Sequence, residues 1–338
     1  MAKIDVRSEH SRQKLSNVIP LETPYVFGFF TGDICNFKCK YCIQASENSG
    51  VELQKIFMNW DVFVAAANEL KKFPERIKKI LFSSMGEPLL NTNLPRMIEY
   101  LNKNEIADCY EIITNASMLT HDLSKKLIDA GLSRLCVSIQ GVSAQKYWDI
   151  SQVKINFAHM VNELAYFYEY AKKNNNNNCS LHIKTVDIAL DDGEDEIFKK
   201  IFSPICDTMF IDNIVPAFPG IDYSNMCDGT MGLYGKTKIR KVCPCVFYTL
   251  YILPNGDVVT CCDPPYPIVL GNIKNESLID MWNGKRRKEF LRMQLQGNRH
   301  KHPVCQRCIQ PNITDFKEDD LDEVAETLLL EVSYEKDK

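Results

Sequence analysis

The sequence predicts an α/β fold, a partial barrel of six strand–helix units followed by a smaller cysteine-rich domain. Six short apolar segments alternate with five amphipathic ones up to about residue 215. Connections of this length imply crossover helices and therefore parallel strands. Beyond residue 215 the alternation stops and cysteines accumulate. A doubly wound sheet would give the same alternation, so the pattern leaves both forms of the sheet open.

The predicted strands are short apolar runs, and the predicted helices carry apolar residues every three or four positions. Val161, Leu164 and Phe167 show this helical spacing within one of them. Each strand is therefore expected to lead into a helix that covers the sheet. The predicted strands are 24–33, 78–86, 109–116, 133–141, 179–190 and 208–215, and the predicted helices are 59–73, 94–104, 121–131, 157–174 and 194–202.

A break in this pattern introduces the second domain. Pro216, Pro219 and Gly220 follow the last predicted strand. Beyond them we expect a hairpin over 250–260, with a Pro-Asn-Gly-Asp turn, and a helix over 277–295. The predicted organisation is an N-terminal extension (1–23), the barrel (24–215), the cysteine-rich domain (216–312) and an acidic tail (313–338).

Composition argues against several classes of protein. Of 338 residues, 45% are hydrophobic and 25% are charged, as in an ordinary globular protein. The net charge of −4 gives no reason to expect a nucleic acid partner. No apolar run reaches the length of about 18 residues that a membrane span requires, so no membrane partner is expected. The polar N-terminus lacks the features of a signal peptide, and a cytoplasmic protein is expected.

Fourteen cysteines are the unusual feature of the composition. In a long chain without an export signal, clustered cysteines indicate metal binding or redox chemistry more than disulfides. The clustered ones are Cys35, Cys39, Cys42, Cys243, Cys261, Cys305 and Cys308. Others stand alone, as small buried residues often do, and these are Cys109, Cys136, Cys179, Cys206 and Cys227. Cys245 and Cys262 adjoin clustered cysteines, and their role is left open.

Three cysteines follow the first predicted strand in a C-x3-C-x2-C pattern, at Cys35, Cys39 and Cys42. Three thiolates on a [4Fe–4S] cluster leave one iron without a protein ligand, and that iron can bind a substrate or cofactor. The loop leaves the strand at its carboxyl end, where α/β folds carry their chemistry. A zinc site or chance spacing is the alternative interpretation.

With Tyr41 before its last cysteine, this pattern resembles the radical S-adenosylmethionine (radical SAM) superfamily. The resemblance implies that the open iron binds S-adenosylmethionine. Reductive cleavage of that cofactor would yield a 5′-deoxyadenosyl radical that abstracts a hydrogen from the substrate. An external electron donor such as flavodoxin or ferredoxin is implied as well, and Tyr41 is counted among the cofactor-binding residues.

Residues at the ends of the next three strands strengthen the resemblance. Gly86, Glu87 and Pro88 match the family's Gly-Glu-Pro motif, which implies that this segment receives the ammonium group of S-adenosylmethionine. Asn115 and Ser138 end the third and fourth predicted strands. The resemblance implies that they line the cofactor site, although such residues can equally cap strand ends.

Cysteines that flank the predicted hairpin mark a second site. The spacing of Cys243, Gly256 and Cys261, with a C-x2-C pair downstream, resembles the SPASM and Twitch auxiliary-cluster domains of radical SAM enzymes. Because no cysteine follows the pair, the resemblance implies one auxiliary [4Fe–4S] cluster rather than two. Structural zinc is the alternative, and Cys245 could replace the first ligand. The implied ligands are Cys243, Cys261, Cys305 and Cys308.

This layout is similar to that of 2-deoxy-scyllo-inosamine dehydrogenase. The likeness implies oxidation of an alcohol on a small sugar or aminocyclitol, with the auxiliary cluster as the electron acceptor. A base is then needed for the hydroxyl proton. His182 and Lys184 share one face of the fifth predicted strand, and Asp212 lies in the sixth. Each is a candidate base or a structural residue.

Other functions stay open at this point. A peptide-modifying maturase is one, although no leader-peptide-binding domain is evident before the first predicted strand. Dehydration or epimerisation of a sugar is another. A cluster carrier or zinc scaffold is the non-enzyme alternative, and failure to cleave S-adenosylmethionine would support it.

Overall fold

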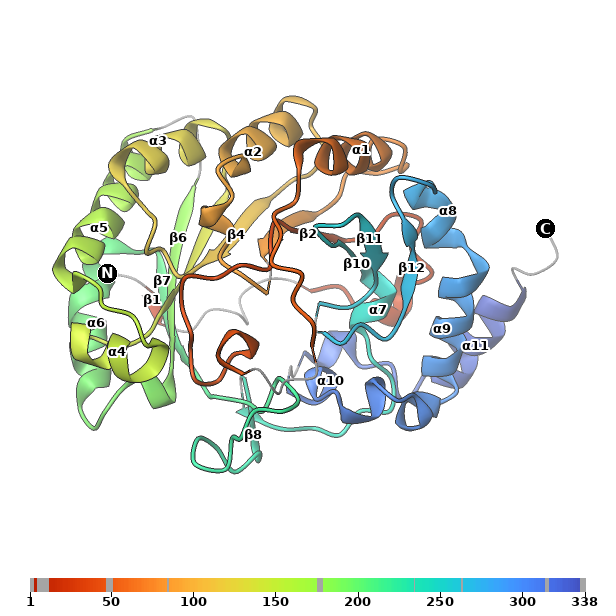
Figure 1. Cartoon of the computed structure of the whole chain (residues 1–338). Coiled ribbons are helices and arrows are strands. Elements are labelled where there is room, and N and C mark those ends of the chain that lie inside the picture. Colours follow the sequence, from red (N-terminus) through yellow and green to blue (C-terminus); the bar gives the residue numbers. More distant parts are fainter. Residues whose placement is uncertain are drawn as a thin grey trace.

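The computed structural model describes residues 3–4, 12–46, 51–83, 85–174, 179–233, 235–262, 264–313 and 316–334. Within these ranges one sheet runs through the protein in the order β1-β7-β6-β5-β4-β3-β2-β10-β11-β12 (Figure 1). All neighbours from β1 to β10 are parallel. The strands are β1 (Lys3–Ile4), β2 (Val26–Phe30), β3 (Lys79–Ser83), β4 (Tyr110–Thr114), β5 (Arg134–Ile139), β6 (Ser180–Val186), β7 (Thr208–Asp212), β10 (Thr249–Ile252), β11 (Asp257–Val259) and β12 (Val269–Asn272).

The order of the strands decides between the two predicted forms of the sheet. A doubly wound sheet reverses its order at a switch point and carries helices on both faces. Strands β2 to β7 follow one another without reversal, so right-handed crossovers place their helices on one face, outside the curved sheet (Figure 1). The predicted partial barrel is therefore confirmed. The helices of this part are α1 (Trp60–Leu70), α2 (Leu94–Lys103), α3 (His121–Asp129), α4 (Ala144–Ser151), α5 (Phe157–Lys173) and α6 (Glu194–Phe202).

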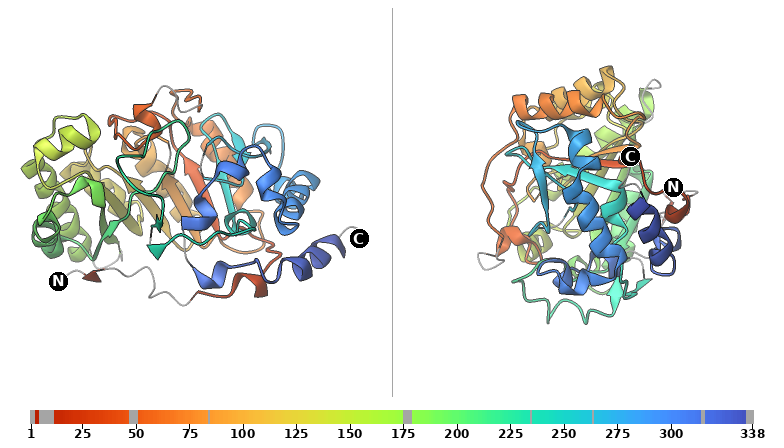
Figure 2. Two further views of the ribbon diagram at one scale, coloured as in Figure 1. Left: turned by 90° about the horizontal axis from the view of Figure 1, so that it is seen from below. Right: turned by 90° about the vertical axis from the view of Figure 1, so that its right-hand side faces the viewer.

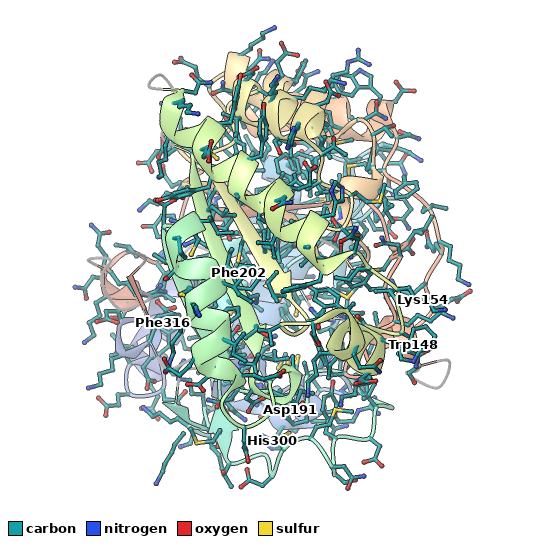
Figure 3. All side chains as sticks on the ribbon, turned by 90° about the vertical axis from the view of Figure 1, so that its left-hand side faces the viewer. Trp148, Lys154, Asp191, Phe202, His300 and Phe316 are labelled. Atoms are coloured by element: carbon teal, nitrogen blue, oxygen red, sulfur yellow. The ribbon has the colours of Figure 1, made fainter. Side chains whose placement is uncertain are left out.

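Side-chain caps explain where several of these helices begin. The Asn59 side chain accepts a hydrogen bond from the Val62 amide at 2.9 Å, and Thr120 accepts one from Leu123 at 3.1 Å. Ser143 begins α4 in the same way, yet the sequence analysis did not predict that helix. It is one of the shorter helices, and Trp148 on its outer side is exposed, 5.8 Å from the ammonium group of Lys154 (Figure 3).

The two faces of the sheet differ in polarity. The outer face packs under the helices, and Phe29, Phe82 and Ile183 belong to this core. Along β6 the buried residues alternate with half-buried ones, so His182 and Lys184 lie on the opposite, inner face. On this strand the inner face therefore carries the polar side chains.

The C-terminal part continues the same sheet. The predicted hairpin is present as β10 and β11, and β10 pairs with β2 in parallel, a contact that the sequence analysis did not foresee. The helix predicted over 277–295 is interrupted at Gly284, whose backbone is extended (ψ 158°), and that prediction of one continuous helix is wrong. The elements of this part are β8 (Met231–Gly232), β9 (Gly235–Lys236), α7 (Cys245–Tyr248), α8 (Leu278–Asn283), α9 (Lys285–Leu295), α10 (Gln310–Ile313) and α11 (Ala325–Tyr334).

Residues near both ends of the chain pack on the C-terminal part. Leu15 and Ile19 join a second hydrophobic core with Phe247, Leu291 and Leu328. Figure 2 shows the N-terminal segment beside the segment that leads into α11. A charged contact supports this packing, because the Arg12 guanidinium lies 2.6 Å from the carboxylate of Asp319.

Among the described residues, no helix combines the length and the apolar character that crossing a membrane would require.

Candidate functional site

The three cysteines of the first motif lie on one loop after β2, and each is half-buried. Burial, with smaller contributions from the charges of Glu87 and Cys42, raises the pKa of Cys35 to about 11. Burial also raises the pKa of Cys39, and the other two thiols add to the rise. The three sulfurs thus share one poorly solvated space in which thiolates repel one another. A cationic centre would relieve that repulsion, so this donor set fits an iron–sulfur cluster.

The cysteine loop is held by a helix far away in the sequence. The amides of Lys38 and Lys40 donate to the carbonyls of Ser151 and Ile150, at 3.0 and 2.9 Å. These carbonyls belong to the last turn of α4, whose own donors cannot reach them. Helix α4 therefore positions the cysteine loop, and the loop amides supply hydrogen-bond donors for the last carbonyls of α4.

The Gly-Glu-Pro segment packs against the same loop. The Glu87 amide donates to the Ile34 carbonyl at 2.8 Å. The buried Glu87 carboxylate accepts from the amides of Leu89 at 2.9 Å and Asn115 at 2.7 Å, and from the Thr114 hydroxyl. Burial raises the pKa of Glu87, and these donors oppose the rise. Glu87 thus connects the end of β4 to the cysteine loop through hydrogen bonds. Its contact with the ammonium group of S-adenosylmethionine stays a prediction.

Replacing Gly86 with alanine is expected to remove iron from the cysteine loop. A Cβ atom at position 86 would collide with the backbone of Ile34, one residue before Cys35. Overpacking of this kind costs about 1–3 kcal/mol of unfolding free energy. Iron content and thermal unfolding of Gly86→Ala measure both effects. Gly193→Ala is the control, because the added Cβ atom would lie in open space and only the left-handed backbone would be strained. Its free energy of unfolding should fall by about 1 kcal/mol, and its iron content should not change. Full iron content in Gly86→Ala would contradict this account.

The remaining predicted cofactor-binding residues lie around the rim of the barrel. The side-chain amide nitrogen of Asn115 lies 4.0 Å from the Cys35 sulfur, next to the cysteine loop. The Tyr41 hydroxyl donates to the Gln140 side-chain oxygen at 2.5 Å, and burial raises the pKa of Tyr41. Ser138 is half-buried and lies opposite Lys184 in the register of β5 and β6. Pro88 begins a short 3-10 helix directly after Glu87.

The three candidate bases separate into a pair and a single residue. The Lys184 ammonium lies 3.4 Å from the Asp212 carboxylate, across β6 and β7. His182 lies one pleat nearer the amino end of β6. Its ring nitrogens contact the hydroxyls of Ser180, at 3.0 Å, and Thr208. The fold therefore brings Lys184 and Asp212 together near the carboxyl edge of the sheet and leaves His182 in a structural network.

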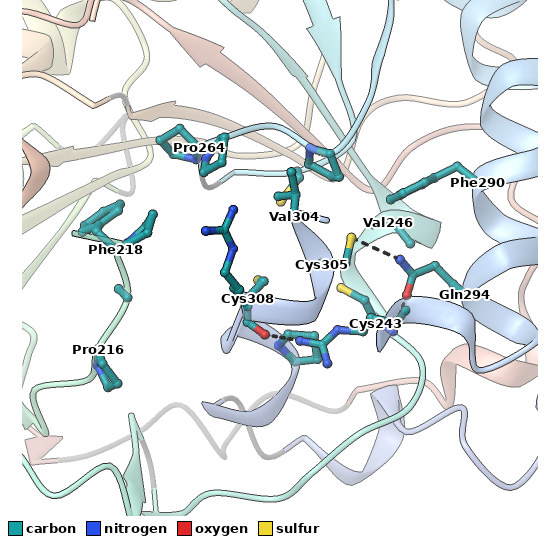
Figure 4. Close-up of a pocket in the computed structure, with 18 residues that line it drawn as sticks. Pro216, Phe218, Cys243, Val246, Pro264, Phe290, Gln294, Val304, Cys305 and Cys308 are labelled. Carbon is teal, nitrogen blue, oxygen red and sulfur yellow. Dashed lines mark hydrogen bonds between the residues drawn. The ribbon is translucent and has the colours of Figure 1, made fainter. Parts of the chain in front are cut away.

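The four cysteines of the second motif line one cavity of about 220 Å³ (Figure 4). They come from separate segments: before α7, after β11, and from the turn that precedes α10. A hydrogen bond with Cys245 and burial raise the pKa of the Cys243 thiol, and burial raises that of Cys305 to about 11. Cys245 itself is not among the lining residues. Four thiols around one hollow fit a fully ligated cluster.

Among the described residues, at neither cysteine motif do three His, Cys, Asp or Glu side chains converge as the ligands of one metal ion would. Four thiolates can bind one zinc ion or, each at a different iron, a four-iron cluster.

A further cavity, of about 360 Å³, lies beside the cysteine loop and was not predicted from the sequence. Asn36 and Phe37 of that loop line it together with Glu163 of α5. Glu163 is buried, and its carboxylate lies 3.7 Å from the ring nitrogens of His121 and His159. The sequence signal for this cavity was Glu163, an acidic residue among the apolar positions of the predicted helix 157–174.

Two family models match the chain, and they cover both parts of the site. The model described as the radical SAM superfamily matches residues 29–185, and the SPASM model, described as an iron–sulfur cluster-binding domain, matches residues 243–309. The chain carries a radical SAM domain followed by a SPASM domain. The radical SAM model implies S-adenosylmethionine and a [4Fe–4S] cluster, and the SPASM model implies auxiliary iron–sulfur clusters.

A relative in sequence matches less than half of the chain. A probable GTP 3′,8-cyclase of Methanococcus maripaludis is 31% identical over 163 residues, which are 41% of this chain and 52% of the cyclase. The chain thus spans about half the length of this curated relative.

Solved structures share the fold across most of the chain. The protein anSMEcpe, with bound AdoMet and the Cp18Cys peptide, has a TM-score of 0.58 at 13% identity and covers 93% of this chain and 98% of its own. BtrN in complex with AdoMet and 2-DOIA has a TM-score of 0.53 at 17% identity, covering 84% and 92%. At such identities the likeness concerns the fold alone.

Proposed function

We propose that this radical SAM protein oxidises an alcohol group of a small polar substrate, a sugar or an aminocyclitol, to a ketone. Removing a hydrogen atom, a proton and an electron from the carbinol turns it into a carbonyl. When bound, the first cluster with S-adenosylmethionine supplies the radical that takes the hydrogen atom, and the auxiliary cluster supplies a place for the electron. The reaction also requires a group that accepts the proton of the hydroxyl.

The pairing of Lys184 with Asp212 on the inner face is the observation that carries this proposal. Their charged atoms lie 3.4 Å apart, and Asp212 is buried while Lys184 is half-buried. A protonated lysine has no lone pair, so the carboxylate of Asp212 is the proton acceptor of the two. The Lys184 ammonium faces that carboxylate and can donate a hydrogen bond to the substrate's oxygen. Ser138, opposite Lys184 in the sheet, borders the same space.

The four-cysteine cavity favours oxidation over the redox-neutral alternatives. Dehydration or epimerisation returns every electron to the product, so neither requires an acceptor cluster. A peptide substrate stays the second candidate, because anSMEcpe, which has a similar fold, has been solved with a bound peptide. Flavodoxin or ferredoxin is the proposed external donor for the first electron.

Asp212→Asn is expected to lower ketone formation about 100-fold to 10,000-fold, the usual contribution of a positioned base. The reconstituted enzyme would be incubated with dithionite, S-adenosylmethionine and a panel of sugar and aminocyclitol alcohols, and the product would be followed by mass spectrometry. Cleavage of S-adenosylmethionine without substrate should stay near the wild-type rate, which separates loss of a base from loss of the cluster. Ketone formed at the wild-type rate would exclude Asp212 as the base. Loss of two hydrogens from a peptide but from no alcohol would refute the proposed substrate class.

A further inference from the structure

Gln294 links two of the three segments that carry the cysteines of the C-terminal cavity. It lies in α9 and is fully buried, which is unusual for glutamine. Its side-chain oxygen accepts a hydrogen bond from the Cys243 amide at 3.2 Å. Its side-chain nitrogen donates toward the Cys305 sulfur at 3.7 Å (Figure 4). A single amide thus contacts residues 62 positions apart in the sequence (243 and 305).

The orientation of this amide follows from its partners. The oxygen and nitrogen of a glutamine side chain look alike in most structures, so their placement must be inferred from the hydrogen bonds. The backbone amide of Cys243 can only donate, and it therefore requires the oxygen of Gln294. The NH2 group is then directed at the Cys305 sulfur.

We propose that Gln294 is a positioning residue for the auxiliary cluster and raises its reduction potential. The inference rests on the proposed auxiliary cluster and its ligand Cys305. A hydrogen bond to a ligating sulfur withdraws electron density from it, which stabilises the more negative, reduced state of the cluster. The same hydrogen bond orients the Cys305 side chain toward the hollow, while the oxygen anchors the segment that carries Cys243.

A positive charge nearby acts in the same direction. The buried guanidinium of Arg299 donates to the Cys308 carbonyl, which places a positive charge beside a ligand segment. Both Gln294 and Arg299 line the cavity. The surroundings of the four cysteines therefore favour added negative charge, as suits a cluster that receives an electron.

The test is the midpoint potential of the C-terminal cluster in Gln294→Glu. This change keeps an oxygen for the Cys243 amide and removes the N–H donor to sulfur, but it also adds a carboxylate. Gln294→Met is therefore measured beside it, because it removes the donor without adding a charge. The full-length chain would carry Cys35, Cys39 and Cys42 all replaced by alanine, so that the remaining iron belongs to the C-terminal site. Potentiometric titration followed by electron paramagnetic resonance should report a more negative potential than in the same background with Gln294. The control, Gln296→Glu, changes an exposed side chain two residues further on and should leave the potential unchanged.

Iron content distinguishes the failure of this inference from the failure of the proposed cluster. If the background protein contains no iron, the auxiliary cluster is wrong and the inference falls with it. If iron is present and Gln294→Glu shifts the potential no more than Gln296→Glu, the inference alone is overturned. Gln294→Met, which is neutral and of similar size, separates loss of the N–H donor from the added charge of glutamate. It should also shift the potential to a more negative value, and an unchanged potential there would overturn the role of Gln294.

Discussion

Replacing Cys35, Cys39 and Cys42 with alanine is expected to abolish formation of 5′-deoxyadenosine. Iron should fall from about eight atoms per chain to about four, because one [4Fe–4S] cluster loses all its ligands while the other keeps its own. The three thiols share one loop, and they are the cysteines next to the Gly-Glu-Pro segment. Anaerobic reconstitution, an iron and sulfide assay, and incubation with dithionite and S-adenosylmethionine measure both effects.

A control separates the loss of ligands from the loss of any thiol. Cys109→Ala changes a half-buried cysteine that lines neither cavity and should keep its iron and its activity. If the wild type contained about four irons and the triple variant none, the C-terminal cysteines would bind zinc or serve only structure. Zinc without iron, together with no deoxyadenosine from the wild type, would contradict the reaction class.

Cys243→Ala is expected to lose about four irons, whereas Cys245→Ala should keep all of them. Cys243 lines the cavity together with the other three cysteines, and Cys245 does not. Cys245 begins α7, where its sulfur contacts the Cys243 thiol and accepts a hydrogen bond from the Tyr248 hydroxyl at 3.7 Å. Iron analysis of each single variant, with the spectrum of the first cluster as an internal reference, measures the difference.

The opposite result would reassign the ligand. Iron lost in Cys245→Ala but kept in Cys243→Ala would mean that the start of α7 turns its sulfur into the cavity when the cluster binds. Equal losses in both variants would point to a folding defect of the segment. Thermal unfolding recognises such a defect, because Phe247 in this segment belongs to the second hydrophobic core.

The regular part of the barrel could be predicted because its signal is local. Each predicted strand from 24–33 to 208–215 contains an observed one, and each predicted helix contains or coincides with an observed one. Apolar periodicity and caps such as Asn59 and Thr120 act within a few residues, so they can be read along the chain. Helix α4 escaped prediction because a short helix offers too few repeats of the pattern.

Contacts between distant segments could not be predicted in this way. Parallel pairing of β10 with β2 joins residues more than 200 positions apart and continues the barrel sheet into the cysteine-rich part. The α4 carbonyls that hold the cysteine loop, and the buried amide of Gln294 between Cys243 and Cys305, are likewise long-range. No periodicity or spacing encodes such pairs, because they arise only when the sheet and its helices have packed.

The sequence by itself determined the class of chemistry, because cluster ligation depends on the type and spacing of cysteines along short loops. Cys35, Cys39 and Cys42 needed no tertiary information to indicate an open-iron cluster. The tertiary structure decided which side chains meet. It paired Lys184 with Asp212, left His182 among hydroxyls, and placed Cys243 rather than Cys245 on the cavity. The physical reason is that charge pairing and shared burial depend on distance in space, which the order of residues does not record.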